Sequence, residues 1–149
     1  AFTALAAAAA ASDPARVERE YHDLFIGVGR GELLPYASYY LTGFLNERPL
    51  AVLRADMAAM GIGRAEGRSE PEDHIATLCE MMSGLITGAF GEPADPAAQR
   101  RFFDRHIARW AGRFFEDLEK AGAAVFYRPL GTVGREFLAV EAEAFRMVG

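Results

Sequence analysis

Cysteine is almost absent from this sequence, and basic residues are in the minority. The single cysteine, Cys79, cannot form an intramolecular disulfide, so a disulfide-stabilised secreted fold is excluded and a reducing, cytoplasmic setting is favoured. The 149 residues include 16 basic and 21 acidic side chains, which gives a formal net charge of −5. Because this charge repels phosphate backbones, we do not expect nucleic acid to be a partner.

Long hydrophobic runs are also lacking. The most apolar segment, residues 2–11, is too short to cross a membrane, consists mostly of alanine and has no basic leader. We therefore predict a helix there and expect neither a signal peptide nor membrane insertion. Since the sequence begins with Ala1 and not with methionine, we also expect that some native N-terminal sequence is missing.

Patterns typical of metal, phosphate or covalent chemistry are missing too. There is no H-E-x-x-H pair, and the adjacent Asp73 and His74 would point about 100 degrees apart on a helix. The glycine-rich segment 27–31 follows a predicted helix and lacks the lysine of a phosphate-binding loop. Cys79 lies beside the apolar stripe of a predicted helix, and Ser38 and Ser83 have no nearby base in the sequence. We expect no metal ion, no cofactor and no catalytic residue.

Apolar residues recur every three or four positions along most of the chain, which predicts helices. The ranges expected to be helical are 2–11, 14–26, 36–44, 50–60, about 70–90, about 97–121 and about 133–147. Only residues 123–127 resemble a strand, so the predicted fold class is all-α. We expect one compact helical domain of residues 1–149, with a core formed mainly by the last three helices and with Trp110 buried. The last helix is expected to bury a stripe made of Val133, Phe137, Val140, Ala144 and Met147.

Residues 61–68 combine three glycines with charges of both signs, which predicts a flexible hinge between the N-terminal and C-terminal halves. Such a hinge would allow two chains to exchange halves, so we expect a monomer that can also form a domain-swapped homodimer. The following Ser69 and Glu72 have the spacing of a capping box, which places the start of the next helix there. Asp73 and His74 would then lie in its first turn, at a cleft edge and outside the core.

Three motifs, in this order, resemble the signatures of the TorD/DmsD family. They are Tyr21-x-x-Leu24-Phe25, Pro35-Tyr36-x-Ser38-x-Tyr40 and Glu70-Pro71-x-Asp73-His74. Downstream, Trp110 with the pair Phe114 and Phe115, and the segment 126–137, resemble the C-terminal helices of that family. The resemblance extends over nearly the whole chain from about Leu5.

The resemblance implies a fold and a function. Proteins of this type are cytoplasmic, non-enzymatic chaperones that bind the twin-arginine signal peptide and the apo form of a molybdopterin-containing oxidoreductase of the DMSO reductase superfamily before export. It further implies that the Asp-His pair and the loop before it bind the signal peptide. We expect Glu70 and Asp73 to bind its arginines through charge-assisted hydrogen bonds. The other residues expected to bind the peptide are Pro71, His74, Tyr21, Leu24, Phe25, Tyr36, Ser38 and Tyr40.

Two other interpretations stay open at this point. The protein could be a small helical GTP-binding protein or hydrolase that uses Asp73 and His74 as an acid–base pair, or a helical adaptor without a peptide groove. The acidic cluster itself could also be only a solvated helix start, because carboxylates are favoured in a first turn. The sequence does not identify which molybdoenzyme would be the client.

Overall fold

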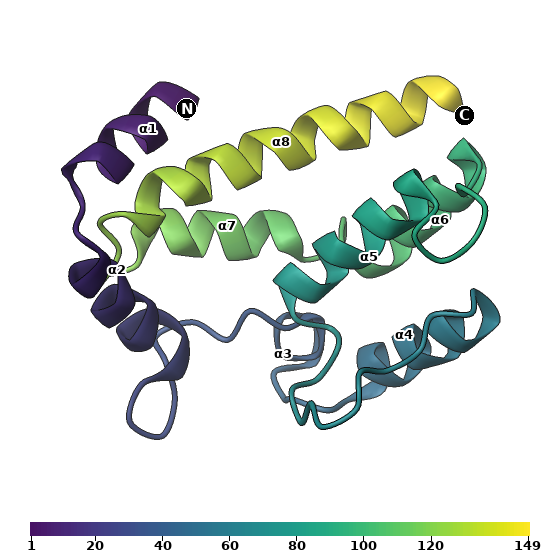
Figure 1. Ribbon diagram of the computed structural model, residues 1–149, viewed down its shortest axis with the longest axis horizontal. Coiled ribbons are helices and arrows are strands. Elements are labelled where there is room, and N and C mark those ends of the chain that lie inside the picture. The colour runs from purple at the N-terminus through teal and green to yellow at the C-terminus, as the bar shows by residue number, and fades with distance from the viewer. The chain divides into compact units, whose positions relative to one another are not determined.

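The computed structural model describes residues 1–149 and consists of helices and connections (Figure 1). The helices are α1 (Phe2–Ala11), α2 (Pro14–Tyr21), the π-helical turn η1 (His22–Ile26), α3 (Ala37–Thr42), α4 (Arg48–Ala59), α5 (Ile75–Thr87), α6 (Pro96–His106), α7 (Ala111–Lys120) and α8 (Tyr127–Val148). The strand-like residues 123–127 form no strand, and the one β-type pairing is an isolated bridge between Tyr36 and His74. The all-α prediction is confirmed. No helix is both long and apolar enough to cross a membrane.

Local sequence explains where several helices begin and end. Asp13 precedes α2, and its carboxylate accepts hydrogen bonds from the first backbone N–H groups of that helix, while Pro14 occupies the first helical position. Asp95 caps α6 in the same way, accepting from the N–H of Ala98. Helix α5 ends at Gly88, which adopts the left-handed conformation that glycine tolerates best.

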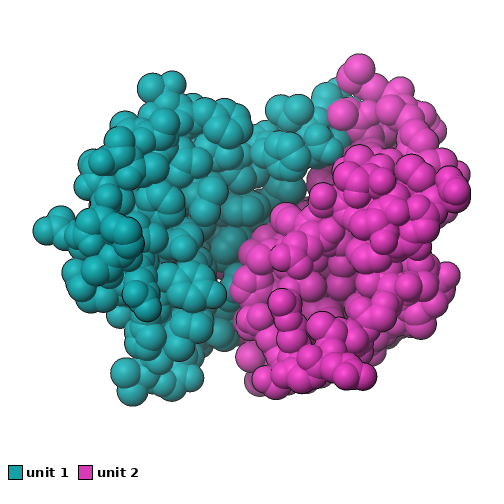
Figure 2. All heavy atoms as spheres, in the orientation of Figure 1, with its two compact units in different colours: residues 1–35, 111–143 teal, residues 36–110, 144–149 magenta.

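Contacts along the chain divide it into two compact units (Figure 2). Unit 1 contains residues 1–35 and 111–143, and unit 2 contains residues 36–110 and 144–149. Both helices that flank the segment 61–68, α4 and α5, belong to unit 2. The hinge predicted for that segment stays a prediction.

Unit 1 is held together by two glutamates that reach distant backbone. The Glu20 carboxylate accepts hydrogen bonds of 2.7–3.0 Å from the N–H groups of residues 125–127, and so caps the start of α8. The Glu32 carboxylate accepts bonds of 2.6 and 3.0 Å from the N–H groups of Gly122 and Ala123, just after α7. The N–H groups at the start of α8 have no acceptor within that helix, and Glu20 supplies one. Together the two glutamates tie the first 32 residues to the ends of α7 and α8.

The prediction of one helix over residues 97–121 is wrong, because this part of the chain forms two helices, α6 and α7. The chain leaves the helical path at Ile107, and α7 begins only at Ala111. Ile107 and Trp110 lie in the intervening turn and are 2% and 1% exposed. Because they are buried there, the apolar spacing continues through the break, and the spacing alone does not reveal it.

The predicted buried stripe of the last helix is also wrong. Phe137, Val140 and Met147 are 56%, 64% and 79% exposed. Helix α8 instead approaches α7 through small residues, since a Cβ atom at Gly134 would lie 2.4 Å from the ring of Phe115. Close packing through glycine selects a different face from the one that apolar periodicity indicates.

The core of unit 2 centres on residues of α4, α5 and α6 and on Trp110, whose predicted burial is confirmed. The indole ring lies 5.5 Å from the ring of Tyr40, and its N–H donates a 2.8 Å hydrogen bond to the carbonyl of His106. The indole therefore fills space and also satisfies its own polar group, as a buried tryptophan must.

We expect Trp110→Ala to lower the free energy of unfolding by about 3–5 kcal/mol, because a large buried aromatic is lost and a cavity remains. Urea denaturation followed by circular dichroism measures this, since the variant has no tryptophan fluorescence. Phe137→Ala, which truncates an exposed ring on α8, is the control and should cost less than about 1 kcal/mol. Equal losses in the two variants would contradict the assignment of the core.

Candidate functional site

Two of the three sequence motifs lie side by side in unit 2. The bridge between Tyr36 and His74 pairs the segment before α3 with the segment before α5 (Figure 1). The N–H of Ala37 donates a 3.1 Å hydrogen bond to the carbonyl of Asp73. Residues 36–40 and 70–74, which are more than thirty positions apart in the sequence, therefore form one local structure.

Asp73 is buried at this junction and is only 1% exposed. Its Oδ2 accepts a 2.8 Å hydrogen bond from the backbone N–H of Ser38 in the first turn of α3. Its Oδ1 is also buried but has no hydrogen-bond partner. The expectation that Asp73 lies at a cleft edge without supporting the core is wrong, because α5 begins only at Ile75 and the bridge turns Asp73 inward.

His74 caps α5, and the predicted capping box at Ser69 and Glu72 is wrong. The imidazole Nδ1 accepts a 3.0 Å hydrogen bond from the N–H of Ala76, so the neutral ring carries its proton on Nε2. Burial lowers the pKa of His74, and the nearby carboxylates of Glu70 and Asp73 offset this only in part. The structure therefore keeps His74 in the neutral form that its role as a cap requires.

The two glutamates of the third motif have different surroundings. The Glu70 side chain is 53% exposed, and its Oε1 accepts a 2.9 Å hydrogen bond from the Tyr36 hydroxyl and lies 3.9 Å from Nε2 of His74. Glu72 is 12% exposed and is bound by Arg54 at 2.8 Å and by Arg64 at 2.6 Å. Burial acts to raise the pKa of Glu72, but these arginines outweigh it and hold the pKa below its ordinary value. Glu70 is thus the glutamate of this motif that remains open to solvent.

The first motif lies in unit 1 and forms an aromatic cluster there. The ring of Phe25 is 5.2 Å from that of Tyr21 and 5.5 Å from that of Tyr127. Tyr21 is 43% exposed, whereas Leu24 is fully buried.

The remaining residues of the second and third motifs lie in unit 2 and differ in their exposure. Ser38 is fully buried, whereas Tyr36, Tyr40 and Pro71 are half-buried. Leu24 and Ser38 support the two local structures, and a peptide-binding role for these residues stays a prediction.

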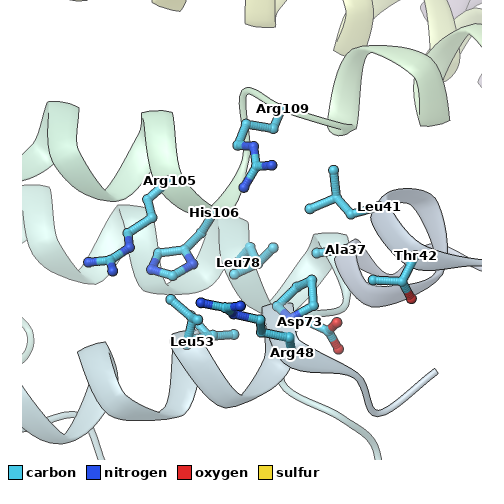
Figure 3. Close-up of a pocket in the computed structure, with 12 residues that line it drawn as sticks. Ala37, Leu41, Thr42, Arg48, Leu53, Asp73, Leu78, Arg105, His106 and Arg109 are labelled. Carbon is cyan, nitrogen blue, oxygen red and sulfur yellow. The ribbon is translucent and has the colours of Figure 1, made fainter. Parts of the chain in front are cut away.

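A pocket next to Asp73 contains residues that the sequence did not single out. It measures about 420 Å³ and lies in unit 2, where α3, α4 and the end of α6 meet (Figure 3). The charged and ionisable side chains that line it are Arg48, Asp73, Arg105, His106 and Arg109. Because Arg48 is about sixty positions from the other two arginines, no local pattern signals that they share one pocket. No group of three or more histidine, cysteine, aspartate or glutamate side chains in the chain could hold a metal ion.

Comparison with known proteins identifies the family of this chain. A family model described as the nitrate reductase delta subunit matches residues 1–116. The chain belongs to the nitrate reductase delta subunit family. This match covers most of the chain and includes all three sequence motifs and α1 to α6.

Individual relatives agree with this family. The chain is 29% identical over 126 residues to the chaperone protein TorD of Vibrio cholerae, and 28% identical over 116 residues to that of Aliivibrio salmonicida. The matches cover 80% and 72% of this chain but 57% and 54% of the relatives, so the chain spans little more than half their length. The predicted resemblance to the TorD/DmsD family is confirmed. Neither name describes a nucleotide hydrolase, so the alternative of a GTP-binding protein or hydrolase is not supported.

Two substitutions of Asp73 distinguish what its hydrogen bond contributes to stability from what its charge contributes. We expect Asp73→Ala to lower the free energy of unfolding by about 1–3 kcal/mol, because the N–H of Ser38 loses its buried acceptor. Asp73→Asn keeps an acceptor oxygen and removes a buried charge, so its loss should be less than about 1 kcal/mol. Urea denaturation of both variants tests this, and an equal loss in both would show that the acceptor is not what matters.

The state of His74 predicts a dependence of stability on pH. The unfolded chain protonates this histidine near pH 6.5, about its ordinary pKa, whereas the folded protein does so only at lower pH. The stability contributed by neutral His74 is therefore complete above about pH 6.5 and is lost as the pH falls through the folded pKa. Asparagine is a good helix cap that does not titrate in this range. We expect His74→Asn to match wild type at pH 7.5 and to lose less stability at pH 5.

Thermal unfolding between pH 5 and 8 measures this difference. The exposed His22 provides a matched control, and His22→Asn should follow the wild-type profile. A His74→Asn profile as steep as that of wild type would show that other groups cause the acid sensitivity.

Proposed function

We propose that this chain is a cytoplasmic, non-enzymatic chaperone that binds the twin-arginine signal peptide of a molybdopterin-containing oxidoreductase and assists its maturation before export. Membership of the nitrate reductase delta subunit family supports the proposal, as do relatives that are named chaperone protein TorD. Because the chain spans little more than half the length of those relatives, the client and the activity of the whole protein belong to the proposal.

The observation that carries the proposal is the exposed carboxylate of Glu70. The Tyr36 hydroxyl holds one of its oxygens, and the rings of Tyr36 and His74 meet edge to face at 5.1 Å beside it. A guanidinium group binds a carboxylate through paired hydrogen bonds and also stacks on aromatic faces. Glu70 with its two aromatic neighbours therefore suits an arginine of a signal peptide.

Asp73 has a different part in this proposal from the one expected from the sequence. Its carboxylate is buried and is used to bind the first turn of α3. It therefore positions the segment that carries Glu70, and Glu70 is the carboxylate that contacts the peptide. The apolar part of the signal peptide would lie on the partly exposed rings of Tyr36 and Tyr40, which belong to the same unit as Glu70. For Tyr21 and Phe25, in unit 1, contact with the peptide stays a prediction from the sequence.

The proposal includes an oligomeric state. The chain is a monomer that can exchange halves with a second copy about residues 61–68. Three glycines in this segment allow the backbone conformations that such an exchange requires.

A peptide titration tests the proposed role of Glu70. The probe is a fluorescent peptide with two adjacent arginines followed by an apolar run, and the comparison peptide has lysines in their place. We expect Glu70→Gln to weaken binding of the arginine peptide about tenfold or more, since a charge-assisted hydrogen bond contributes about 1.5–3 kcal/mol. Fluorescence anisotropy measures the dissociation constants.

Glu66→Gln is the matched control, because Glu66 is also exposed and lies in the preceding connection. It should bind the arginine peptide as wild type does. The proposal fails if wild type does not distinguish the arginine peptide from the lysine peptide, or if Glu70→Gln and Glu66→Gln bind equally well.

A further inference from the structure

Glu70 also borders a second pocket of unit 2, which measures about 180 Å³. Residues of α4, of α5, of the connection between these helices and of the segment just after α5 form its walls. Tyr36 and Tyr40 do not line this pocket. The residue proposed to bind an arginine therefore stands beside a separate space that can take a neighbouring side chain of the same peptide.

Much of the pocket wall is apolar. Met57, Ile62 and Met81 are buried, and the ring of Phe90 remains 42% exposed. Gly84 on α5 lets this ring lie against the helix, because a Cβ atom at that position would overlap it. Methionine side chains are flexible and polarisable, so they adapt to apolar groups of different shape. The pocket therefore suits an apolar group without requiring one particular shape.

The volume of the pocket limits what can enter it. Pockets that hold whole small molecules measure about 300–1,000 Å³, so this one is too small for a nucleotide or a similar cofactor. A cavity of about 150 Å³ holds a benzene ring. A pocket of about 180 Å³ thus fits one large side chain, such as that of leucine or phenylalanine, from a longer chain.

The charged residues around the pocket favour a cationic partner. Three glutamates and two arginines line it, which leaves one negative charge: they are Glu70, Glu72, Glu80, Arg64 and Arg68. Arg64 and Glu72 neutralise each other across 2.6 Å. Glu70 and Glu80 are both exposed, and Glu80 forms no ion pair or hydrogen bond within the chain. Arg68 offsets only one of these two charges, so a positively charged segment is attracted to the pocket rim.

We propose that this pocket holds a large apolar side chain that follows closely on the arginine bound by Glu70, and that Glu80 is a second contact for the basic part of the peptide. The inference rests on the proposed function, because the arginine at Glu70 is what brings the peptide to the pocket. Successive residues of an extended peptide are about 3.3 Å apart, so a side chain one or two positions from the arginine reaches the neighbouring pocket. The protein then distinguishes arginines that precede a large apolar residue from arginines in a polar segment.

A titration followed by nuclear magnetic resonance of the methionine methyl groups tests this proposal. Two of the five methionines, Met57 and Met81, line the pocket, whereas Met147 on α8 does not. The probe is the peptide Gly-Arg-Arg-Ala-Leu-Ala-Gly with blocked ends, and the comparison peptide has serine in place of leucine. We expect the leucine peptide to shift the signals of Met57 and Met81 saturably and to leave that of Met147 unchanged. The serine peptide should bind about tenfold more weakly, because it buries no large apolar side chain.

Variants of the pocket locate the site. Thr77→Leu adds apolar volume to the wall on α5, so it should reduce the preference for the leucine peptide to about threefold or less. Ala65→Leu, at an exposed position of the connection, makes the same test without changing a helix. Glu80→Gln should weaken binding of both peptides about twofold to fivefold, as expected for an exposed ion pair. The control is Glu66→Gln, whose side chain is exposed but does not line the pocket, and it should bind as wild type does.

Three results would overturn the inference. They are equal affinity for the leucine and serine peptides, no shift of the Met57 and Met81 signals at millimolar peptide, and an undiminished preference for leucine in both Thr77→Leu and Ala65→Leu. Equal binding by Glu80→Gln and Glu66→Gln would remove Glu80 from the site. Failure of the proposed function looks different, since wild type would then not distinguish arginine from lysine. A protein that prefers arginine but treats leucine and serine alike keeps the proposed function and rejects this inference.

Discussion

The hydrogen bond from the Ser38 N–H to the buried carboxylate of Asp73 joins two segments on which the site of unit 2 depends. One segment leads into α3, and the other leads into α5. A charged acceptor is a strong partner for an N–H in a first helical turn, where no backbone carbonyl of the helix can serve. This bond and the Tyr36 bridge fix the path of residues 70–74, and the positions of the other functional side chains follow from that path.

Once Asp73 turns inward, its neighbours take different roles. His74 is left to cap α5, which requires its neutral form, and the surrounding burial favours that form. Glu70 remains exposed and is oriented by Tyr36. A motif that reads as one acidic cluster in the sequence therefore separates into a structural carboxylate, a helix cap and an exposed acceptor. Burial, and not residue type, assigns these roles.

The sequence by itself determined the helical class and many helix boundaries, because these depend on local chemistry. Asp13 with Pro14, and Asp95 with Pro96, mark helix starts through caps that need only neighbouring residues. The three ordered motifs likewise indicated the family, and Trp110 was correctly expected in the core.

Tertiary structure alone decided the features that join distant residues. The break at Ile107 is hidden by burial of the turn, and the packed face of α8 is set by Gly134 against Phe115 on another helix. Asp73 is buried because Ser38, thirty-five positions earlier, supplies its donor. Arg48 and Arg109 share a pocket only through the packing of α3, α4 and α6. Periodicity and capping report what a residue's near neighbours impose, whereas burial and the meeting of charges depend on which helices the folded chain brings together.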